Sequence, residues 1–158
     1  MQALPLPSSL ERKSLLALDY GTKFCGLATY KVGIDPFPLM HGRVSYQDDE
    51  TLVNYLQSII EEDFIDIMVV GIPFFTDGSS SKLTQRITNF YNRLARSLKI
   101  PCFSVDETLT TFEAEQRMLQ DPKFNFKVDP KQIDALSATI ILEEFIKTVE
   151  NKNHEKNL

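Results

Sequence analysis

The order of the apolar segments is the feature that most restricts the fold of this chain. Residues 15–19, 65–70 and 101–105 form short, nearly continuous apolar runs, which are typical of strands covered on both faces. Apolar residues at helical spacing precede the second and the third run. Because each of these two strands returns through a helix, we expect both to lie parallel to the first, with right-handed crossovers.

Antiparallel strands are expected on the other side of the first run. Residues 20–23 (YGTK) allow only a tight turn, so residues 24–30 should return as an antiparallel strand. A third strand is predicted near residues 39–45, after two prolines. With a short helix over 111–120 and a final helix from about 130 to 149, the element order becomes β-β-β-α-β-α-β-α-α. This order predicts an α/β fold of the ribonuclease-H-like type, a mixed five-stranded sheet flanked by helices.

Length and composition indicate one globular domain. The chain has 158 residues with 42% hydrophobic residues, enough for one core. We expect this domain to span residues 1–158, with its core at about 14–149 and flexible ends, a loose arm over 1–13 and a frayed tail over 150–158. Cys25 and Cys102 form no CxxC pair and have apolar neighbours, so both are predicted to be reduced core residues.

The sequence also predicts the cellular compartment. Two prolines and two serines interrupt the apolar start of the N-terminus, and the basic residues follow it, which is unlike a secretory signal. No apolar run approaches the roughly 20 residues of a membrane-spanning helix. We therefore expect a cytoplasmic protein with no membrane contact. The sequence does not indicate the oligomeric state.

Acidic residues lie where two predicted strands end and where the last helix begins. Asp19 ends the first strand, Asp106 and Glu107 follow the last one, and Asp134 is in the first turns of the final helix. Ligands of α/β proteins gather at the carboxyl ends of parallel strands, so these carboxylates can converge. Strand alternation places Asp106 and Glu107 on opposite sides, and the sequence leaves open which of them faces the others.

Each acid also has an ordinary structural interpretation. Asp19 could open a turn, and Glu107 and Asp134 could be acids in the first turn of a helix. The segment 76–79 could bind a phosphate or could be a capped turn. His41 and His154 are isolated and have no zinc spacing. If the three acids do converge, hard oxygen ligands favour Mg²⁺ or Mn²⁺, with Asp19, Glu107 and Asp134 as catalytic residues and metal ligands.

Four motifs resemble one known family. LDYGTK at residues 18–23 with Gly26, VGIP at 70–73 with Asp77-Gly78, VDETLTT at 105–111 with Glu113-Ala114, and DALSA at 134–138 resemble the motifs of the YqgF/RuvX family, the Holliday-junction-resolvase-like nucleases. The motifs keep their order over about residues 14–147. The resemblance implies a ribonuclease-H-like fold, an acidic site at Asp19, Glu107 and Asp134, and a cytoplasmic nuclease that matures the 5′ end of pre-16S ribosomal RNA.

The chain departs from this family at two positions that are usually basic. Phe24 follows the first motif, and Thr108 lies in the third, so two phosphate-contacting charges are absent. The net charge of −5 also lacks the basic excess typical of nucleic-acid-binding domains, although bound cations supply local positive charge. Thr22, Lys23 and Arg86, with Lys82 beside them, are the candidate substrate contacts.

Two other functions fit parts of the sequence. A non-catalytic RNA-binding or ribosome-assembly factor on the same fold would keep the acids as structural residues. Actin-like ATPases and sugar kinases also carry Asp-x-Gly-Thr after a first strand, but they need two such domains around a nucleotide. The preferred prediction is a divalent-metal-dependent nuclease that hydrolyses phosphodiester bonds of ribosomal RNA precursor.

Overall fold

A mixed five-stranded sheet forms the centre of the computed structural model, which describes residues 3–74, 81–107 and 110–156. The strand order is β3-β2-β1-β4-β5. β1 pairs antiparallel with β2 and parallel with β4, while β2–β3 is antiparallel and β4–β5 is parallel. The predicted mixed sheet is therefore confirmed. The strands are β1 (Ser14–Asp19), β2 (Phe24–Lys31), β3 (Leu39–Ser45), β4 (Ile67–Ile72) and β5 (Cys102–Asp106).

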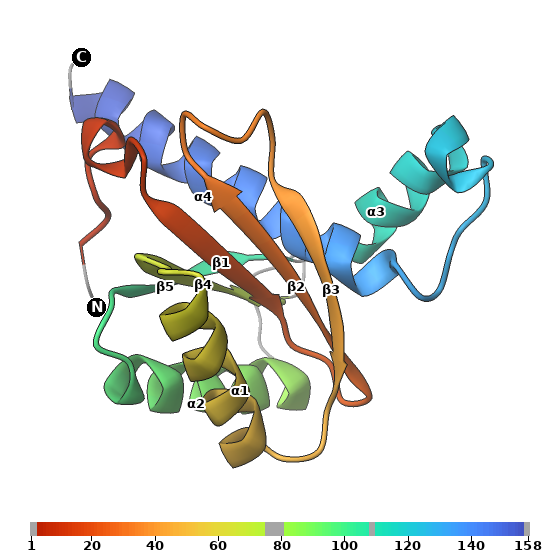
Figure 1. Cartoon of the computed structure of the whole chain (residues 1–158), viewed down its shortest axis with the longest axis horizontal. Helices are drawn as coiled ribbons and strands as arrows, with labels where there is room; N and C mark the ends of the chain where they lie inside the picture. The colour runs from red at the N-terminus through yellow and green to blue at the C-terminus, as the bar shows by residue number, and fades with distance from the viewer. Residues whose placement is uncertain (1–2, 75–80, 108–109, 157–158) are drawn as a thin grey trace.

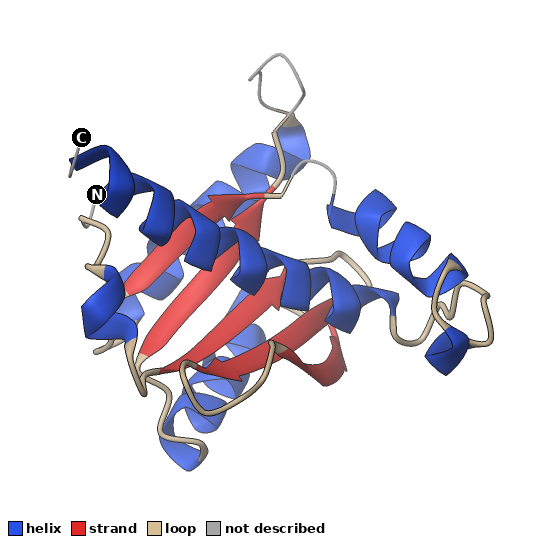
Figure 2. Cartoon of the chain, turned by 90° about the horizontal axis from the view of Figure 1, so that it is seen from above, coloured by secondary structure: helices blue, strands red, loops and turns tan. Residues whose placement is uncertain are grey.

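Helices cover both faces of this sheet (Figure 1). α1 (Asp49–Glu62) and α2 (Lys82–Ser97) pack on one face, and α4 (Ile133–Lys156) crosses the other (Figure 2). α3 (Thr110–Leu119) packs on α4 and extends beyond the sheet. An ion pair of 2.7 Å between Arg117 of α3 and Glu143 of α4 joins these two helices.

The central strands are apolar on both faces because both faces are covered. On β1, Leu16 and Leu18 belong to the core beneath α1 and α2, whereas Leu15 and Ala17 belong to the core beneath α4. All residues of β4 are buried as well. This double burial explains the continuous apolar runs, since an alternating pattern is expected only where one face meets water.

The helix starts follow local hydrogen-bonding rules. The Asp48 side chain caps α1 by accepting a hydrogen bond from the Thr51 amide, and Ser81 caps α2 through the Thr84 amide. α4 begins at Ile133, three residues later than the expected position 130. The reason is Asp129, whose carboxylate accepts hydrogen bonds from the Lys131 amide and the Gln132 side chain and holds a turn there.

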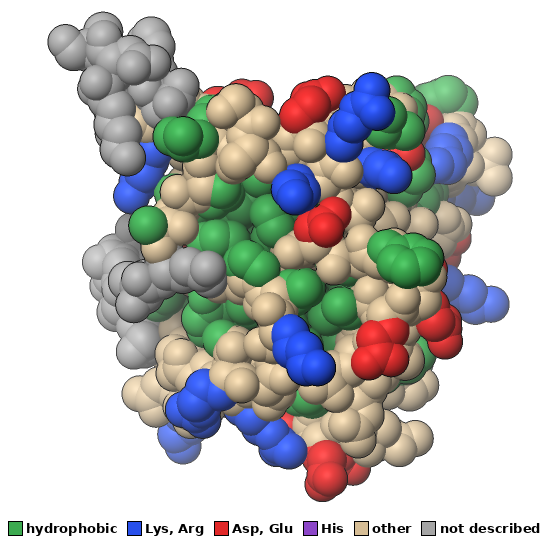
Figure 3. Space-filling view, turned by 60° about the vertical axis from the view of Figure 1, so that its left-hand side comes forward, with side chains coloured by type: hydrophobic (Ala, Val, Ile, Leu, Met, Phe, Trp, Pro, Cys, Tyr) green, Lys and Arg blue, Asp and Glu red, His purple; other side chains and the backbone are tan. Residues whose placement is uncertain are grey.

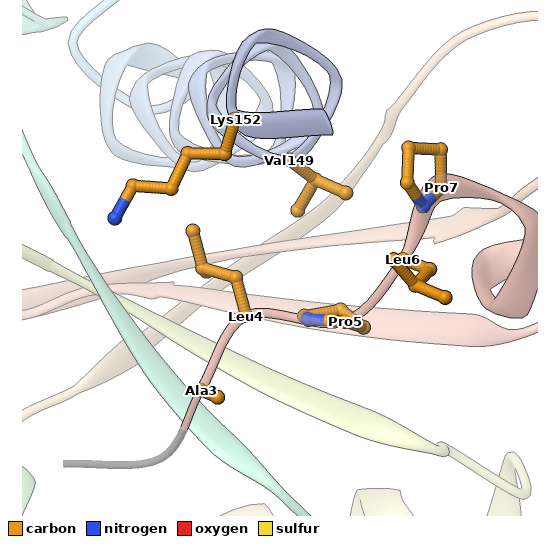
Figure 4. Close-up of a pocket in the computed structure, with 7 residues that line it drawn as sticks. All are labelled: Ala3, Leu4, Pro5, Leu6, Pro7, Val149 and Lys152. Carbon is orange, nitrogen blue, oxygen red and sulfur yellow. The ribbon is translucent and has the colours of Figure 1, made fainter. Parts of the chain in front are cut away.

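Regular secondary structure extends into both ends of the chain, where the sequence predicts an arm and a tail. Residues Pro7–Leu10 form a 3-10 helix, and Leu10 is buried in the core beneath α4. The N-terminal segment lies beside Val149 near the end of α4, and together they line a cavity of about 210 Å³ (Figure 4). α4 also continues to Lys156. Apolar residues of the N-terminal segment gain burial against α4, a tertiary contact that local composition does not reveal.

The prediction that both cysteines are core residues is confirmed. Cys25 and Cys102 are free and buried, and burial raises the pKa of the Cys25 thiol to about 11. His41 is exposed. Among the described residues, none of the helices has the length and apolarity that crossing a membrane requires.

Candidate active site

Asp19 lies at the centre of a row of residues that crosses the whole sheet. It pairs with Gly26 of β2 on one side and with Gly71 of β4 on the other. Gly26 in turn pairs with Arg43 of β3, and Gly71 pairs with Val105 of β5. Side chains within such a row point to the same face. The carboxylate of Asp19 therefore has a glycine on each side, and both glycines leave space above the sheet.

The space above Gly71 is taken by Glu107. A Cβ atom added at Gly71 would lie 2.8 Å from the carboxyl carbon of Glu107 and would also overlap the Ile141 side chain. The Glu107 amide continues the sheet by donating to the carbonyl of Ile72 at 3.1 Å. Thr110 Oγ1 donates to Glu107 Oε2 at 3.1 Å and fixes the carboxylate. A glycine at position 71 is thus what allows Glu107 to reach Asp19.

The space above Gly26 is taken by the first turn of α4. A Cβ atom at Gly26 would overlap the backbone carbonyl of Asp134 and lie 2.8 Å from the Ala135 amide nitrogen. The start of α4 therefore rests directly on β2. This contact brings Asp134, more than a hundred residues away in sequence, next to Asp19.

Asp19 and Glu107 form a hydrogen-bonded carboxyl pair. Burial raises the pKa of Asp19 well above its usual range, and the neighbouring charges of Glu107 and Asp134 raise it further. Burial likewise raises the pKa of Glu107, although its hydrogen bonds with Asp19 and Thr110 oppose that change. Both changes favour the protonated form over the ionised form of these two carboxyl groups.

Asp134 is the third acid of the group. It is half-buried, and burial raises the pKa of its carboxyl group. The same helix face continues through Ala138, Ile141 and Phe145, all of which are fully buried. Asp134 therefore lies at the start of an apolar stripe, where an unpaired carboxylate is costly to bury.

The open choice between Asp106 and Glu107 has a geometric answer. Asp106 is exposed at the end of β5, whereas Glu107 is only 7% exposed and contacts Asp19. Glu107 is thus the residue that joins the acidic group.

A cavity of about 240 Å³ opens over these acids. It is a candidate binding space because polar and apolar groups converge there from the strand ends and from three helices. Asp19 is half-buried as a residue and lines this cavity. The cavity lining consists of Asp19, Tyr20, Gly21, Pro73, Leu83, Ile87, Glu107, Thr110, Thr111 and Asp134.

The three predicted substrate contacts lie outside this lining. Thr22 and Lys23 are exposed in the turn that follows Asp19 and Tyr20. Arg86 of α2 donates from Nε to the Tyr20 hydroxyl at 3.0 Å, and its guanidinium lies 5.1 Å from the centre of the Tyr46 ring. Arg86 therefore contacts the cavity only through Tyr20. Residues 76–79, the Asp77-Gly78 motif and Thr108 lie outside the described residues, as does the side chain of His154.

The residues present suit a divalent cation by their chemistry. Within the described part of the chain, no three His, Cys, Asp or Glu side chains are already close enough to hold a metal ion. The hydrogen-bonded pair of Asp19 and Glu107 nevertheless leaves carboxyl oxygens in a buried place, with Asp134 on the same cavity. Hard oxygen donors are the ligands of Mg²⁺ and Mn²⁺, and a bound cation would favour the ionised form of both carboxyl groups.

Fold and site together define a class of protein. A mixed five-stranded sheet in the order β3-β2-β1-β4-β5 with helices on both faces is the arrangement of ribonuclease-H-like domains. Among solved structures, the chain resembles T. thermophilus RuvC in complex with a Holliday junction substrate, with a TM-score of 0.57 and 14% identity over 86% of this chain and 96% of that chain. At this identity the likeness shows the fold.

The sequence comparison identifies the family. The model of the RuvX family, described as Holliday junction resolvase, matches residues 13–148, and the chain belongs to this family. One relative, from Crocosphaera subtropica, is 31% identical over 87% of this chain and 94% of its own length. Another, from Rippkaea orientalis, is 34% identical over 87% of this chain and 97% of its own length. Both carry the name "Putative pre-16S rRNA nuclease". The predicted family is confirmed.

Proposed function

We propose that this protein is a divalent-metal-dependent nuclease that hydrolyses phosphodiester bonds, acting in the cytoplasm on the precursor of 16S ribosomal RNA. The observation that carries the proposal is the buried carboxyl pair of Asp19 and Glu107, which shares one cavity with Asp134. The family membership and the names of the relatives support the same activity and suggest the RNA substrate.

The roles of the acids follow from their placement. Asp19, Glu107 and Asp134 would hold Mg²⁺ or Mn²⁺, which supplies Lewis-acid chemistry and favours ionisation of water for attack on phosphorus. The Thr110 hydroxyl orients Glu107, and the small residue at position 71 keeps its path to Asp19 open. Without a cation, burial and the neighbouring Glu107 disfavour the ionised form of Asp19.

The surroundings of the cavity offer contacts to a polymer that extends beyond it. The cavity is open, and its walls include apolar atoms of Pro73, Leu83 and Ile87 beside the acids. Thr22 and Lys23 are exposed directly after β1, where a strand passing the cavity would reach them. We propose that Thr22 and Lys23 both contact the nucleic acid. We propose Arg86, which is hydrogen-bonded to Tyr20, as a third contact.

The test is a cleavage assay with two labelled substrates. Wild-type protein with Mn²⁺ or Mg²⁺ is incubated with a precursor fragment of 16S ribosomal RNA and, in parallel, with a four-way DNA junction. We expect cleavage of the RNA that chelator and Asp19→Asn both abolish. Cleavage of the junction alone would reassign the substrate. Binding of RNA without cleavage under any metal condition would instead support the assembly-factor function and overturn the nuclease proposal.

A further inference from the structure

Arg43 shares a face of the sheet with the acidic group. It pairs across β3 and β2 with Gly26, which itself pairs with Asp19. Two strand spacings place the Cα atoms of Arg43 and Asp19 about 10 Å apart, with both side chains on the α4 side. The backbone of Asp134 packs on the glycine between them. A positively charged side chain thus lies on the same face of the sheet as the acids. It comes from β3, which supplies none of the three acids.

The guanidinium of Arg43 is held in a fixed position. It lies 3.7 Å from the centre of the Phe24 ring, and Nη1 donates to the carbonyl of Pro130 at 3.5 Å. Stacking on an aromatic face stabilises an arginine and limits the rotamers it can adopt. A group that is already ordered loses little entropy when it binds a ligand. Phe24 carries no charge itself, but its ring holds the positively charged guanidinium of Arg43 in place.

Arg43 has two acidic neighbours, Asp129 and Asp134, and forms a salt bridge with neither. Arg43 is half-buried and forms no ion pair with any residue in the described ranges. Its charge is still felt nearby, because it partly offsets the burial that raises the pKa of Asp134. An arginine has five N–H donors in a planar fork that matches phosphate oxygens, and the Pro130 carbonyl accepts only one of them here.

The surroundings make a single fixed cation important. The chain has a net charge of −5, and on the face shown in Figure 3 basic, acidic and apolar side chains are interspersed. In such a protein, phosphate contacts must come from individual residues that are held in place near the site.

We propose that Arg43, held on Phe24, binds a backbone phosphate of the nucleic acid beside Asp134 and positions the strand over the acidic group. The inference rests on the proposed nuclease function and adds a substrate contact to it. The competing interpretation is that Arg43 only ties β3 to the turn before α4 through Pro130. A purely structural tie would change the stability of the protein but not the salt dependence of RNA binding.

The test measures RNA affinity as a function of salt concentration. Binding of a labelled precursor fragment of 16S ribosomal RNA is followed by fluorescence polarisation in a chelator, so that cleavage does not interfere. The variants are Arg43→Gln and Phe24→Leu. The matched control is Arg96→Gln, which removes one exposed arginine from α2 on the opposite face of the sheet.

We expect Arg43→Gln to weaken binding about tenfold, as for the loss of one charged hydrogen-bonding contact. It should also reduce the slope of log affinity against log salt by about 1, as for one lost phosphate contact. Phe24→Leu should weaken binding less and keep most of the slope, because the charge remains but is no longer held. The control should match wild type in both quantities.

Wild-type affinity and slope in Arg43→Gln would overturn the inference, whatever the melting temperature of the variant. If Arg43→Gln fails to fold, Phe24→Leu decides, and unchanged affinity in that variant would overturn it equally. The outcome is separable from the nuclease proposal. If Arg43→Gln loses RNA binding and wild type does not cleave, the proposed Arg43 contact stands and the nuclease proposal is rejected. Cleavage by wild type with an unaffected Arg43→Gln would do the reverse.

Discussion

Replacing Glu107 by glutamine should stabilise the metal-free protein. In the native fold Glu107 is 7% exposed and hydrogen-bonds to another acid, and burial raises its pKa to about 7. Ionising it at neutral or higher pH therefore costs folding free energy. A glutamine of nearly the same shape has no charge to bury, and its amide can donate to the Asp19 carboxylate. Glu107, which is proposed as a metal ligand, is thus predicted to lower the stability of the metal-free protein.

The size of the effect follows from the pKa. Moving a glutamate from 4.5 to about 7 corresponds to about 3 kcal/mol of unfavourable interaction once the group is fully ionised. The buried amide has a desolvation cost of its own, so we expect a net gain near 2 kcal/mol in the free energy of unfolding at about pH 8. For a chain of this length, each 1 kcal/mol raises the melting temperature by about 2–4 °C.

The pH dependence has a definite sign. Because the folded protein holds the proton more tightly than the unfolded chain, Glu107 favours folding below its unfolded pKa of about 4.5. That contribution is lost as the pH rises through the folded pKa of about 7. Metal-free wild type should therefore lose stability between these values. Glu107→Gln should lose less over the same range, so the difference between the two proteins grows with pH.

The assay is urea or thermal unfolding of both proteins in a chelator across this pH range. Glu62→Gln is the matched control, since Glu62 is an exposed residue of α1 and the substitution removes the same charge. The reasoning is refuted if Glu107→Gln is no more stable than wild type at about pH 8, or if its advantage does not change with pH.

Three further predictions test other contacts. Gly71→Ala should destabilise the protein by about 1–3 kcal/mol and reduce cleavage more than binding, because the new Cβ meets the carboxyl group of Glu107; unfolding curves and separate kcat and KM values check this. Thr110→Val removes a buried hydrogen bond to Glu107 and should cost about 1 kcal/mol in unfolding experiments. Leu10→Ala should cost about 2–5 kcal/mol if the N-terminal segment is part of the core, whereas a loose arm predicts no change.

Much of the fold is predictable from this sequence because its elements are strongly patterned. The buried strands are continuous apolar runs, and the order of strands and helices permits few topologies. The exceptions depend on tertiary contacts. The burial of Leu10 beneath α4 and the turn held by Asp129 that delays α4 involve partners or local hydrogen bonds that periodicity does not report.

The site is predictable in part for the same reason. The ends of β1 and β5 point to Asp19 and to the pair Asp106 and Glu107, but strand alternation alone does not decide which of the pair turns inward. The decisive contact is at Gly71, whose missing side chain leaves room for Glu107. Gly71 lies in the VGIP motif and pairs with Asp19 of β1. The sequence therefore contains a signal for this contact, although not for its partner.

Arg43 is the residue that sequence reasoning missed. It follows a glycine in an exposed strand and belongs to none of the recognised motifs. Its relation to Asp19 exists only through the register of three strands, and its contact with Phe24 is a cross-strand stack. Register is set by pairing across the sheet, so no local pattern indicates such a neighbour.

The central claim is that Asp19, Glu107 and Asp134 act together as one metal site. Calorimetric titration of the metal-free protein with Mn²⁺ tests it most directly, with Asp19→Asn, Glu107→Gln, Asp134→Asn and the control Glu62→Gln measured in parallel. We predict binding by wild type and the control, and loss of most of the affinity in each of the three site variants. No binding by wild type, or wild-type affinity in Asp19→Asn, would contradict the account.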